Sequence, residues 1–210
     1  TDNSGRLVVL RPDNTTPLAR IAATRLKNAP RPLKMFYNQD VFRISRDYSG
    51  KRSQFKQTGI EIFGGNSEKA DLEVIVTALR TLEEISDFYG GTVKYKLELG
   101  HAKFCNALLD SLGLDKEKRE AVTKYISAKN SSSLEVVLGD GENMRDAMQI
   151  IRQIPRLYGS KSVINDARKL CYGVIEAEKA LDYLEKLYTV LDTNGFSENI
   201  SIDLATVNDM

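Results

Sequence analysis

The spacing of hydrophobic positions changes repeatedly between strand and helix patterns in the first hundred residues. A short apolar run, Leu7–Leu10, predicts a strand. A helix is expected to follow, with Thr16 as its N-cap and an end at Pro30, because proline does not continue a helix. Lys34–Ile44 and Gln54–Phe63 flank a polar, glycine-containing stretch, which predicts a hairpin.

An amphipathic helix and an alternating strand complete this part of the chain. Lys69–Asp87 has apolar side chains every three or four residues, and Gly90 and Gly91 follow its end. Val93–Leu99 alternates apolar and polar side chains, the pattern of a strand that buries one face. We therefore expect an α+β fold, in which an antiparallel sheet is flanked by helices.

Further along the chain, the strand pattern gives way to helical spacing. We expect residues 101–172 to form a helical insertion within a core that consists of residues 1–100 and 173–210. Because the chain begins in the turn-forming Asp2–Gly5 and stops directly after the strand-like Ile200–Leu204, we also expect a fragment that lacks both ends of this core. The predicted helices are Lys103–Leu112, Lys116–Lys129, Asn143–Ile154, Val163–Tyr172 and Val174–Leu191.

Composition and charge are those of a soluble globular protein. Hydrophobic residues make up 41% of the 210 residues and charged residues 28%, and the formal net charge is +1. Such a balance supplies no overall field for nucleic acid or for an anionic membrane. No apolar run approaches the ~18 residues of a membrane span, and no signal segment opens the chain. We expect a cytoplasmic protein that binds neither nucleic acid nor membranes.

Cysteine and histidine are too scarce for several kinds of site. Cys105 and Cys171 are far apart in the sequence, so we expect two buried, reduced thiols and no zinc site. The single histidine, His101, excludes a metal site built on histidines and is expected to be a capping or structural residue. Gly139 and Gly141 lack the spacing of phosphate-binding glycine motifs, which predicts a turn. We expect no metal and no cofactor.

The predicted strand Gln54–Phe63 has one face that suits a small ligand. Alternation places Gln57, Gly59 and Glu61 on this face and apolar side chains on the other. The amide and the carboxylate lie ~13 Å apart along an extended strand, and Gly59 leaves space between them for one amino acid. The alternative is an ordinary solvated strand face.

Polar residues elsewhere add to the candidates. Asp13 and Thr15 follow the first predicted strand and supply a carboxylate and a hydroxyl, although both types are also ordinary loop and cap residues. Arg43 belongs to a basic hairpin that suits a triphosphate or another polyanion, the alternative being a solvated hairpin tip.

Three segments resemble, in order and spacing, the catalytic core of histidyl-tRNA synthetases. They are Leu10–Pro17 (LRPDNTTP), Val41–Arg43 (VFR) and Gln54–Glu61 (QFKQTGIE). Within this superfamily, Arg-Pro-Asp-x-Thr-Thr-Pro in place of the synthetases' Arg-Pro-Glu-Gly-Thr is typical of the regulatory subunits of ATP phosphoribosyltransferase. The resemblance implies the antiparallel sheet of a class II aminoacyl-tRNA synthetase.

The resemblance also implies roles for the polar residues of the loop and the strand. Positions that match Asp13, Thr15 and Gln57 contact the amino group of a bound histidine in the synthetases, and the position that matches Glu61 contacts its imidazole. Gly59 is then the floor of the pocket. No catalytic residue is implied.

The ATP side departs from the synthetase pattern. Arg43 matches the arginine that contacts the α-phosphate, and it is the candidate phosphate contact. Ser45 stands where a nucleotide-contacting glutamate is usual, and Ser53 replaces a phosphate-contacting arginine. An alignment of Thr206–Met210 with the second histidine motif puts Asn208 at the position of the catalytic arginine. Loss of that cation removes stabilisation of charge on the α-phosphate.

The resemblance therefore implies a non-catalytic regulatory subunit. Such a subunit forms a hetero-oligomer with a catalytic ATP phosphoribosyltransferase subunit, binds histidine, and supports activity and histidine feedback in the first step of histidine biosynthesis. Self-association as a dimer is also expected, because synthetase-like cores pair. The alternatives are a divergent histidyl-tRNA synthetase fragment that activates histidine with ATP, and a synthetase-like regulator with another partner.

Overall fold

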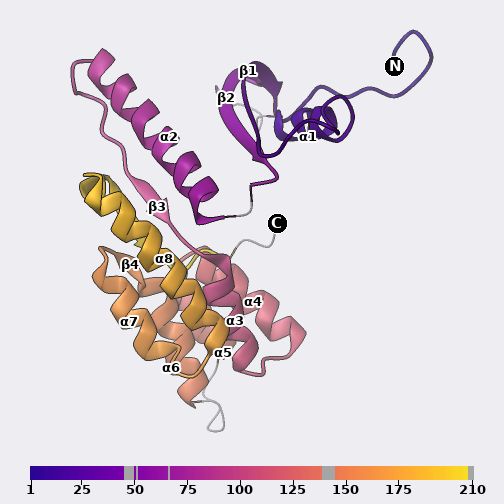
Figure 1. Ribbon diagram of the computed structural model, residues 1–210. Coiled ribbons are helices and arrows are strands. Elements are labelled where there is room, and N and C mark those ends of the chain that lie inside the picture. The colour runs from indigo at the N-terminus through magenta and orange to yellow at the C-terminus, as the bar shows by residue number, and fades with distance from the viewer. Residues whose placement is uncertain (45–49, 51, 66, 139–144, 208–210) are drawn as a thin grey trace. The chain divides into compact units, whose positions relative to one another are not determined.

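The chain folds into two compact units, which are described separately. The computed structural model describes all residues except 45–49, 51, 66, 139–144 and 208–210 (Figure 1). The first unit is Thr1–Thr77 and the second is Ala78–Met210. The turn expected at Gly139 and Gly141 lies outside the described residues. The division into a core and a helical insertion stays a prediction.

A two-stranded antiparallel hairpin forms the centre of the first unit (Figure 1). Strand β1 (Leu33–Phe42) pairs with β2 (Gln54–Phe63), and the register sets Tyr37 opposite Gly59. Helix α1 (Thr15–Ala23) contacts β2. The predicted hairpin is confirmed, and β2 has the predicted bounds.

Helix α2 (Glu68–Phe88) begins in the first unit and continues into the second. It confirms the helix predicted for Lys69–Asp87. An ion pair between Lys34 Nζ and Glu73 Oε1, 2.6 Å long, connects its first half to β1. Both side chains are about half exposed, so this pair contributes at most ~1 kcal/mol to stability.

The segment before α1 differs from the sequence prediction. Leu7–Leu10 forms no strand, and the exposed fractions of its residues range from 57% to 86%. A strand needs a neighbouring backbone to bond to. Among the described residues, the backbone hydrogen bond that joins β1 to this part of the chain comes after Leu10: the Phe42 N–H donates to the Arg11 carbonyl at 2.9 Å.

Helix α1 is shorter than the prediction and begins earlier. Its N-cap residue is Asn14 rather than Thr16, and it ends at Ala23. The Thr24 hydroxyl then donates to the Arg20 carbonyl at 2.6 Å. This side-chain bond competes with the backbone bonding that would extend the helix toward the prolines.

The second unit contains a three-stranded sheet. Its central strand is β5 (Ile200–Asp203), flanked by β3 (Leu97–Leu99) and β4 (Tyr158–Gly159). β3 and β5 are parallel, whereas antiparallel pairing is the expectation from the sequence. Parallel neighbours need a long crossover, and the helices between β3 and β5 supply it. β3 is also shorter than predicted, because residues 93–96 form no strand.

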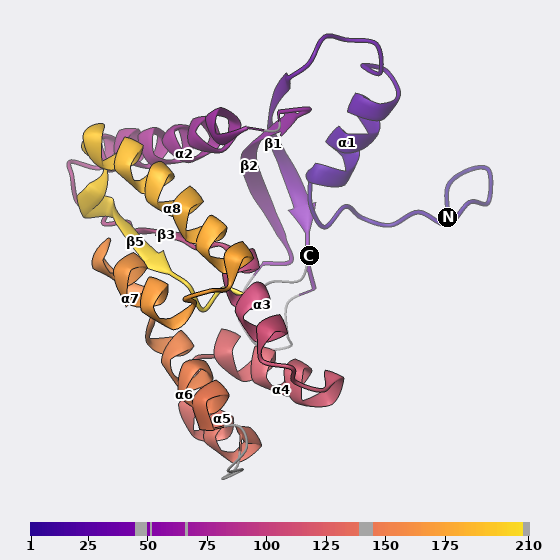
Figure 2. The ribbon, with the colours of Figure 1, turned by 60° about the horizontal axis from the view of Figure 1, so that its bottom comes forward.

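Helices make up most of the second unit (Figure 2). They are α3 (Ala102–Ser111), α4 (Lys116–Ser127), α5 (Ser131–Leu138), α6 (Arg145–Gln153), α7 (Ser162–Leu170) and α8 (Ile175–Thr193), with 3-10 turns at Ile154–Arg156 and Ser197–Asn199. α8 packs against α3 and α7 and buries its leucine stripe. No helix among the described residues is long and apolar enough to cross a membrane.

Helix α5 is absent from the sequence prediction, because its three serines are typical of a linker. The structure shows how these serines begin a helix. The Ser133 N–H donates to Asn130 Oδ1 at 3.0 Å, so an asparagine side chain satisfies the first turn. Leu134 and Leu138 are then buried and anchor the helix.

In the second unit, the two cysteine side chains are buried and the histidine ring contacts a tyrosine ring. Both cysteines are buried free thiols, as predicted. Burial raises the pKa of the Cys105 thiol to about 12 and also raises the pKa of Cys171. His101 is the N-cap residue of α3 without a capping side-chain bond, and its ring lies edge-on to Tyr183 with 5.7 Å between centroids.

An ion pair joins the turn after α4 to β5. Lys129 has a φ of 50°, which is uncommon for a residue with a side chain. Its Nζ lies 2.7 Å from Asp203 Oδ2 and 4.4 Å from the centroid of the Tyr158 ring. The hydrogen bond to Asp203 raises the pKa of Lys129. Asp203 is buried, and its Oδ1 accepts from the Ala205 N–H at 3.0 Å.

We expect Asp203→Ala to lower the free energy of unfolding by about 2 kcal/mol, because the buried Ala205 N–H and the Lys129 ammonium lose their acceptor. Lys129→Gly is the matched variant. It removes the same ion pair but relieves the left-handed backbone, so its loss should be smaller. Urea unfolding measures both values. Unchanged stability in Asp203→Ala would contradict this role of the ion pair.

Candidate functional site

The hairpin brings a row of facing side-chain pairs to one side of the first unit. Register partners in an antiparallel pair share a face, so each residue of the predicted β2 face has a neighbour on β1. The pairs are Gln39 with Gln57, Tyr37 with Gly59, and Met35 with Glu61. This face therefore has two amides at one end and a carboxylate at the other.

The first turn of α1 is tied to the carboxylate end of this face. Thr15 Oγ1 donates a hydrogen bond to Glu61 Oε1 at 2.6 Å. The bond joins residues 46 positions apart in the sequence and holds the Glu61 side chain in one orientation. A carboxylate accepts several hydrogen bonds, so Glu61 keeps acceptor capacity for a ligand.

Asn14 contacts the amide end of the face, although it is not among the residues predicted from the sequence. This residue is 2% exposed, and its Nδ2 donates to Gln57 Oε1 at 3.2 Å. The sequence signal was its residue type, since asparagine favours N-caps, and in the structure Asn14 directly precedes α1. The side chain makes no capping bond, however, and bonds to β2 instead.

Asp13 lies beside these residues and has a different hydrogen-bond partner. Its Oδ1 accepts from the Thr16 N–H at 3.2 Å, so it bonds to the first turn of α1. Its carboxylate also lines a groove of about 770 Å³ between α1 and the segment before it. The start of α1 thus bonds to both ends of the β2 face, through Thr15 to Glu61 and through Asn14 to Gln57. Asp13 lies at the start of the same helix.

Tyr37 covers Gly59. A Cβ atom built on Gly59 would lie 2.5 Å from the Tyr37 Cζ and closer still to its hydroxyl oxygen. Only glycine lets the phenol ring approach the β2 backbone this closely. The space directly above Gly59 is therefore occupied by the ring, and a ligand would lie against Tyr37. The register of the hairpin, which sets Tyr37 opposite Gly59, is the feature from which this contact could be predicted.

Arg43 directly follows β1, at the loop end of the hairpin. Its Nε donates to the Pro12 carbonyl at 3.0 Å, and its guanidinium carbon lies 5.5 Å from the centroid of the Phe55 ring. These contacts orient the side chain. Its assignment as a phosphate contact stays a prediction, and Ser45 and Asn208 lie outside the described residues.

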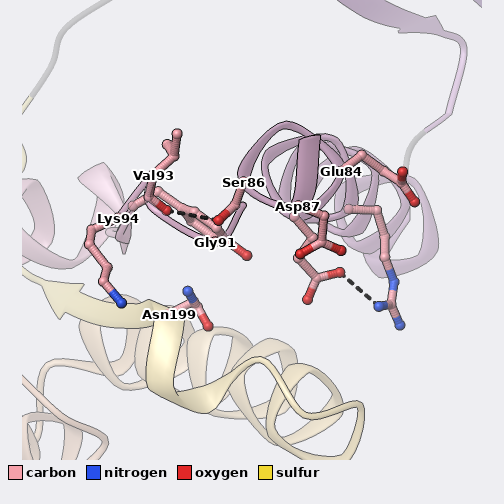
Figure 3. A pocket seen from close by; sticks show the side chains of 10 residues that line it. Glu84, Ser86, Asp87, Gly91, Val93, Lys94 and Asn199 are labelled. Atoms are coloured by element: carbon pink, nitrogen blue, oxygen red, sulfur yellow. Dashed lines mark hydrogen bonds and ion pairs between the residues drawn. The ribbon is translucent and has the colours of Figure 1, made fainter. Parts of the chain in front are cut away.

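A second cavity lies in the other unit, near the end of α2, and none of the candidate site residues lines it (Figure 3). Its volume is about 530 Å³. Arg80 pairs with Glu83 at 2.7 Å across its wall, and the Ser86 hydroxyl donates to the Val93 carbonyl at 3.1 Å. Burial raises the pKa of Tyr95, and the carboxylates of Glu83 and Asp87 raise it further.

Comparisons with known proteins match the whole chain. The family model described as histidyl-tRNA synthetase covers residues 1–210. The ATP phosphoribosyltransferase regulatory subunit of Clostridium acetobutylicum is 36% identical over 208 residues, 98% of this chain and 50% of that protein. A solved Bacillus halodurans structure, named an ATP phosphoribosyltransferase regulatory subunit/histidyl-tRNA synthetase, is 29% identical with a TM-score of 0.83, covering 98% of this chain and 52% of that one.

A more distant solved structure supports the fold alone. A chain of the ATP phosphoribosyl transferase complex from Thermotoga maritima is 20% identical, with a TM-score of 0.69, and the match covers 98% of this chain and 68% of that one. The chain spans about half the length of the curated relatives that it matches. The expected class II synthetase-like fold is confirmed, and the chain belongs to the histidyl-tRNA synthetase family.

Proposed function

We propose that the chain is part of a regulatory subunit of ATP phosphoribosyltransferase, that it binds histidine on the β2 face, and that it catalyses no reaction. The observation that carries this proposal is the hydrogen bond from Thr15 to Glu61, 2.6 Å long. It joins Leu10–Pro17 to Gln54–Glu61, two of the segments that resemble histidyl-tRNA synthetases. The relative from Clostridium acetobutylicum bears the name of that subunit. Both observations support the same reading.

Histidine suits the chemistry of this face. Glu61 would accept a hydrogen bond from the imidazole, and the Tyr37 ring would supply an aromatic surface beside it. Asp13, Thr15 and Gln57 would contact the amino-acid end, as in the synthetases that the chain resembles. Gly59 would shape the floor of the pocket indirectly: it admits the Tyr37 ring, and the ligand would lie against that ring.

The proposed partner is a catalytic ATP phosphoribosyltransferase subunit in the cytoplasm. The name of the Clostridium acetobutylicum relative, a regulatory subunit, supports a hetero-oligomer. The Thermotoga maritima neighbour, which shares the fold, is a chain of an ATP phosphoribosyl transferase complex. Feedback requires that histidine bind different quaternary states with unequal affinity. We also propose that two copies of the chain pair, as synthetase-like cores do.

The rival reading is a histidyl-tRNA synthetase fragment that activates histidine with ATP. The alignment opposes it, because serines replace a nucleotide-contacting glutamate at Ser45 and a phosphate-contacting arginine at Ser53, and asparagine replaces the catalytic arginine at Asn208. Electrostatic stabilisation of the α-phosphate depends on such groups. Arg43 alone would remain on the phosphate side.

We expect Glu61→Ala to weaken histidine binding about 10- to 150-fold, because it removes a charge-assisted hydrogen bond to the imidazole. Lys56→Ala is the control, since alternation places Lys56 on the opposite face of β2. Isothermal titration calorimetry with L-histidine measures both. An affinity in Glu61→Ala equal to that of the unmodified protein would remove Glu61 from the site.

We expect the protein to raise the turnover of a short-form catalytic ATP phosphoribosyltransferase subunit and to make that turnover sensitive to histidine. The measurement is the phosphoribosyltransferase rate at increasing ratios of the two proteins. A rate that stays unchanged at saturating ratios of the cognate pair would contradict the regulatory assignment.

A pyrophosphate-exchange assay on the same preparation distinguishes the regulatory subunit from a histidyl-tRNA synthetase fragment. The proposed regulator should show no histidine-dependent exchange between pyrophosphate and ATP. Exchange at a rate typical of synthetases would favour the rival, because only an adenylating enzyme produces it.

A further inference from the structure

Two primary amides face each other at one end of the site, and both already use their carbonyl oxygen. Gln39 and Gln57 are register partners in the hairpin. Arg11 Nη1 donates to Gln39 Oε1, and Asn14 Nδ2 donates to Gln57 Oε1. The polar groups that remain on the two amides are their NH₂ groups, which donate hydrogen bonds and accept none.

The burial of Asn14 fixes the orientation of the Gln57 amide. An asparagine at an N-cap usually accepts a bond from its own helix, but here Asp13 accepts from the Thr16 N–H instead. Asn14 is 2% exposed, so reversing its amide would place a buried oxygen against the oxygen of Gln57. Its donor therefore keeps the Gln57 carbonyl occupied.

The same end of the face also carries a positive charge. Arg11 Nε donates to the Asp40 carbonyl at 2.8 Å, which holds the guanidinium against β1 next to Gln39. Glu61, four residues further along β2 on the same face, carries the negative charge. The row of side chains thus runs from hydrogen-bond donors and a cation at one end to a carboxylate at the other.

We infer that Gln39 and Gln57 form a subsite for the α-carboxylate of the bound amino acid, with Asn14 and Arg11 as the residues that orient the two amides. This inference rests on the proposed function and deepens it. It changes the contact of Gln57 from the amino group to the carboxylate. Asp13, Thr15 and Glu61 then contact the ammonium and imidazole groups.

Two ligands and two variants test the subsite. L-Histidinol has a hydroxymethyl group in place of the carboxylate and keeps the amine and the imidazole. Asn14→Asp replaces the donor to Gln57 with an acceptor, and Gln39→Glu, at an exposed position, replaces an NH₂ donor with a carboxylate. Asn38→Asp is the control, because it adds the same charge on the opposite face, where Thr58 Oγ1 donates to Asn38 Oδ1.

We expect both variants to bind L-histidine about tenfold more weakly than the unmodified protein, while their affinity for L-histidinol changes less than twofold. The control should change neither. Calorimetry with both ligands gives the comparison, and circular dichroism confirms folding. Equal losses for both ligands, or no loss for L-histidine, would overturn the subsite. An unmodified protein that binds neither ligand would overturn the proposed function itself.

Discussion

The register of the β1–β2 hairpin is the constraint on which the candidate site depends. Side chains alternate along a strand, so a shift by one residue would move Gln57 and Glu61 to the opposite face. The ladder runs without interruption from Leu33 with Phe63 to Phe42 with Gln54. The Tyr37 ring then fits over Gly59 only in this register. One backbone pairing thus fixes the spacing between the amide end and the carboxylate end.

Helix α1 supplies the remaining residues of the candidate site. Its N-cap asparagine and its first threonine bond to opposite ends of the same face of β2. The proposed site would bind a zwitterion in one direction, because different groups would contact its carboxylate and its side chain. In the proposed regulator, binding needs only to differ between quaternary states, whereas adenylation would need fixed charges around a phosphate.

The sequence pattern predicts those parts of the structure that depend on residues close together in the chain. The bounds and faces of β2 follow from alternation, and the two thiols follow from their isolation in the sequence. Contacts between distant segments decide the rest. Leu7–Leu10 has strand composition but no backbone partner among the described residues. Asn14 has N-cap chemistry, yet its bond to Gln57 depends on how α1 meets β2. The parallel pairing of β3 with β5 depends on a crossover of about a hundred residues, which no local pattern reveals.

A crystal structure of the protein with L-histidine tests the central claim most directly. The account predicts histidine on the β2 face, with an imidazole nitrogen within ~3.2 Å of a Glu61 oxygen and the carboxylate at the Gln39 and Gln57 amides. Histidine bound away from this face would contradict the account, and the same holds for histidine in the reverse direction with its carboxylate at Glu61.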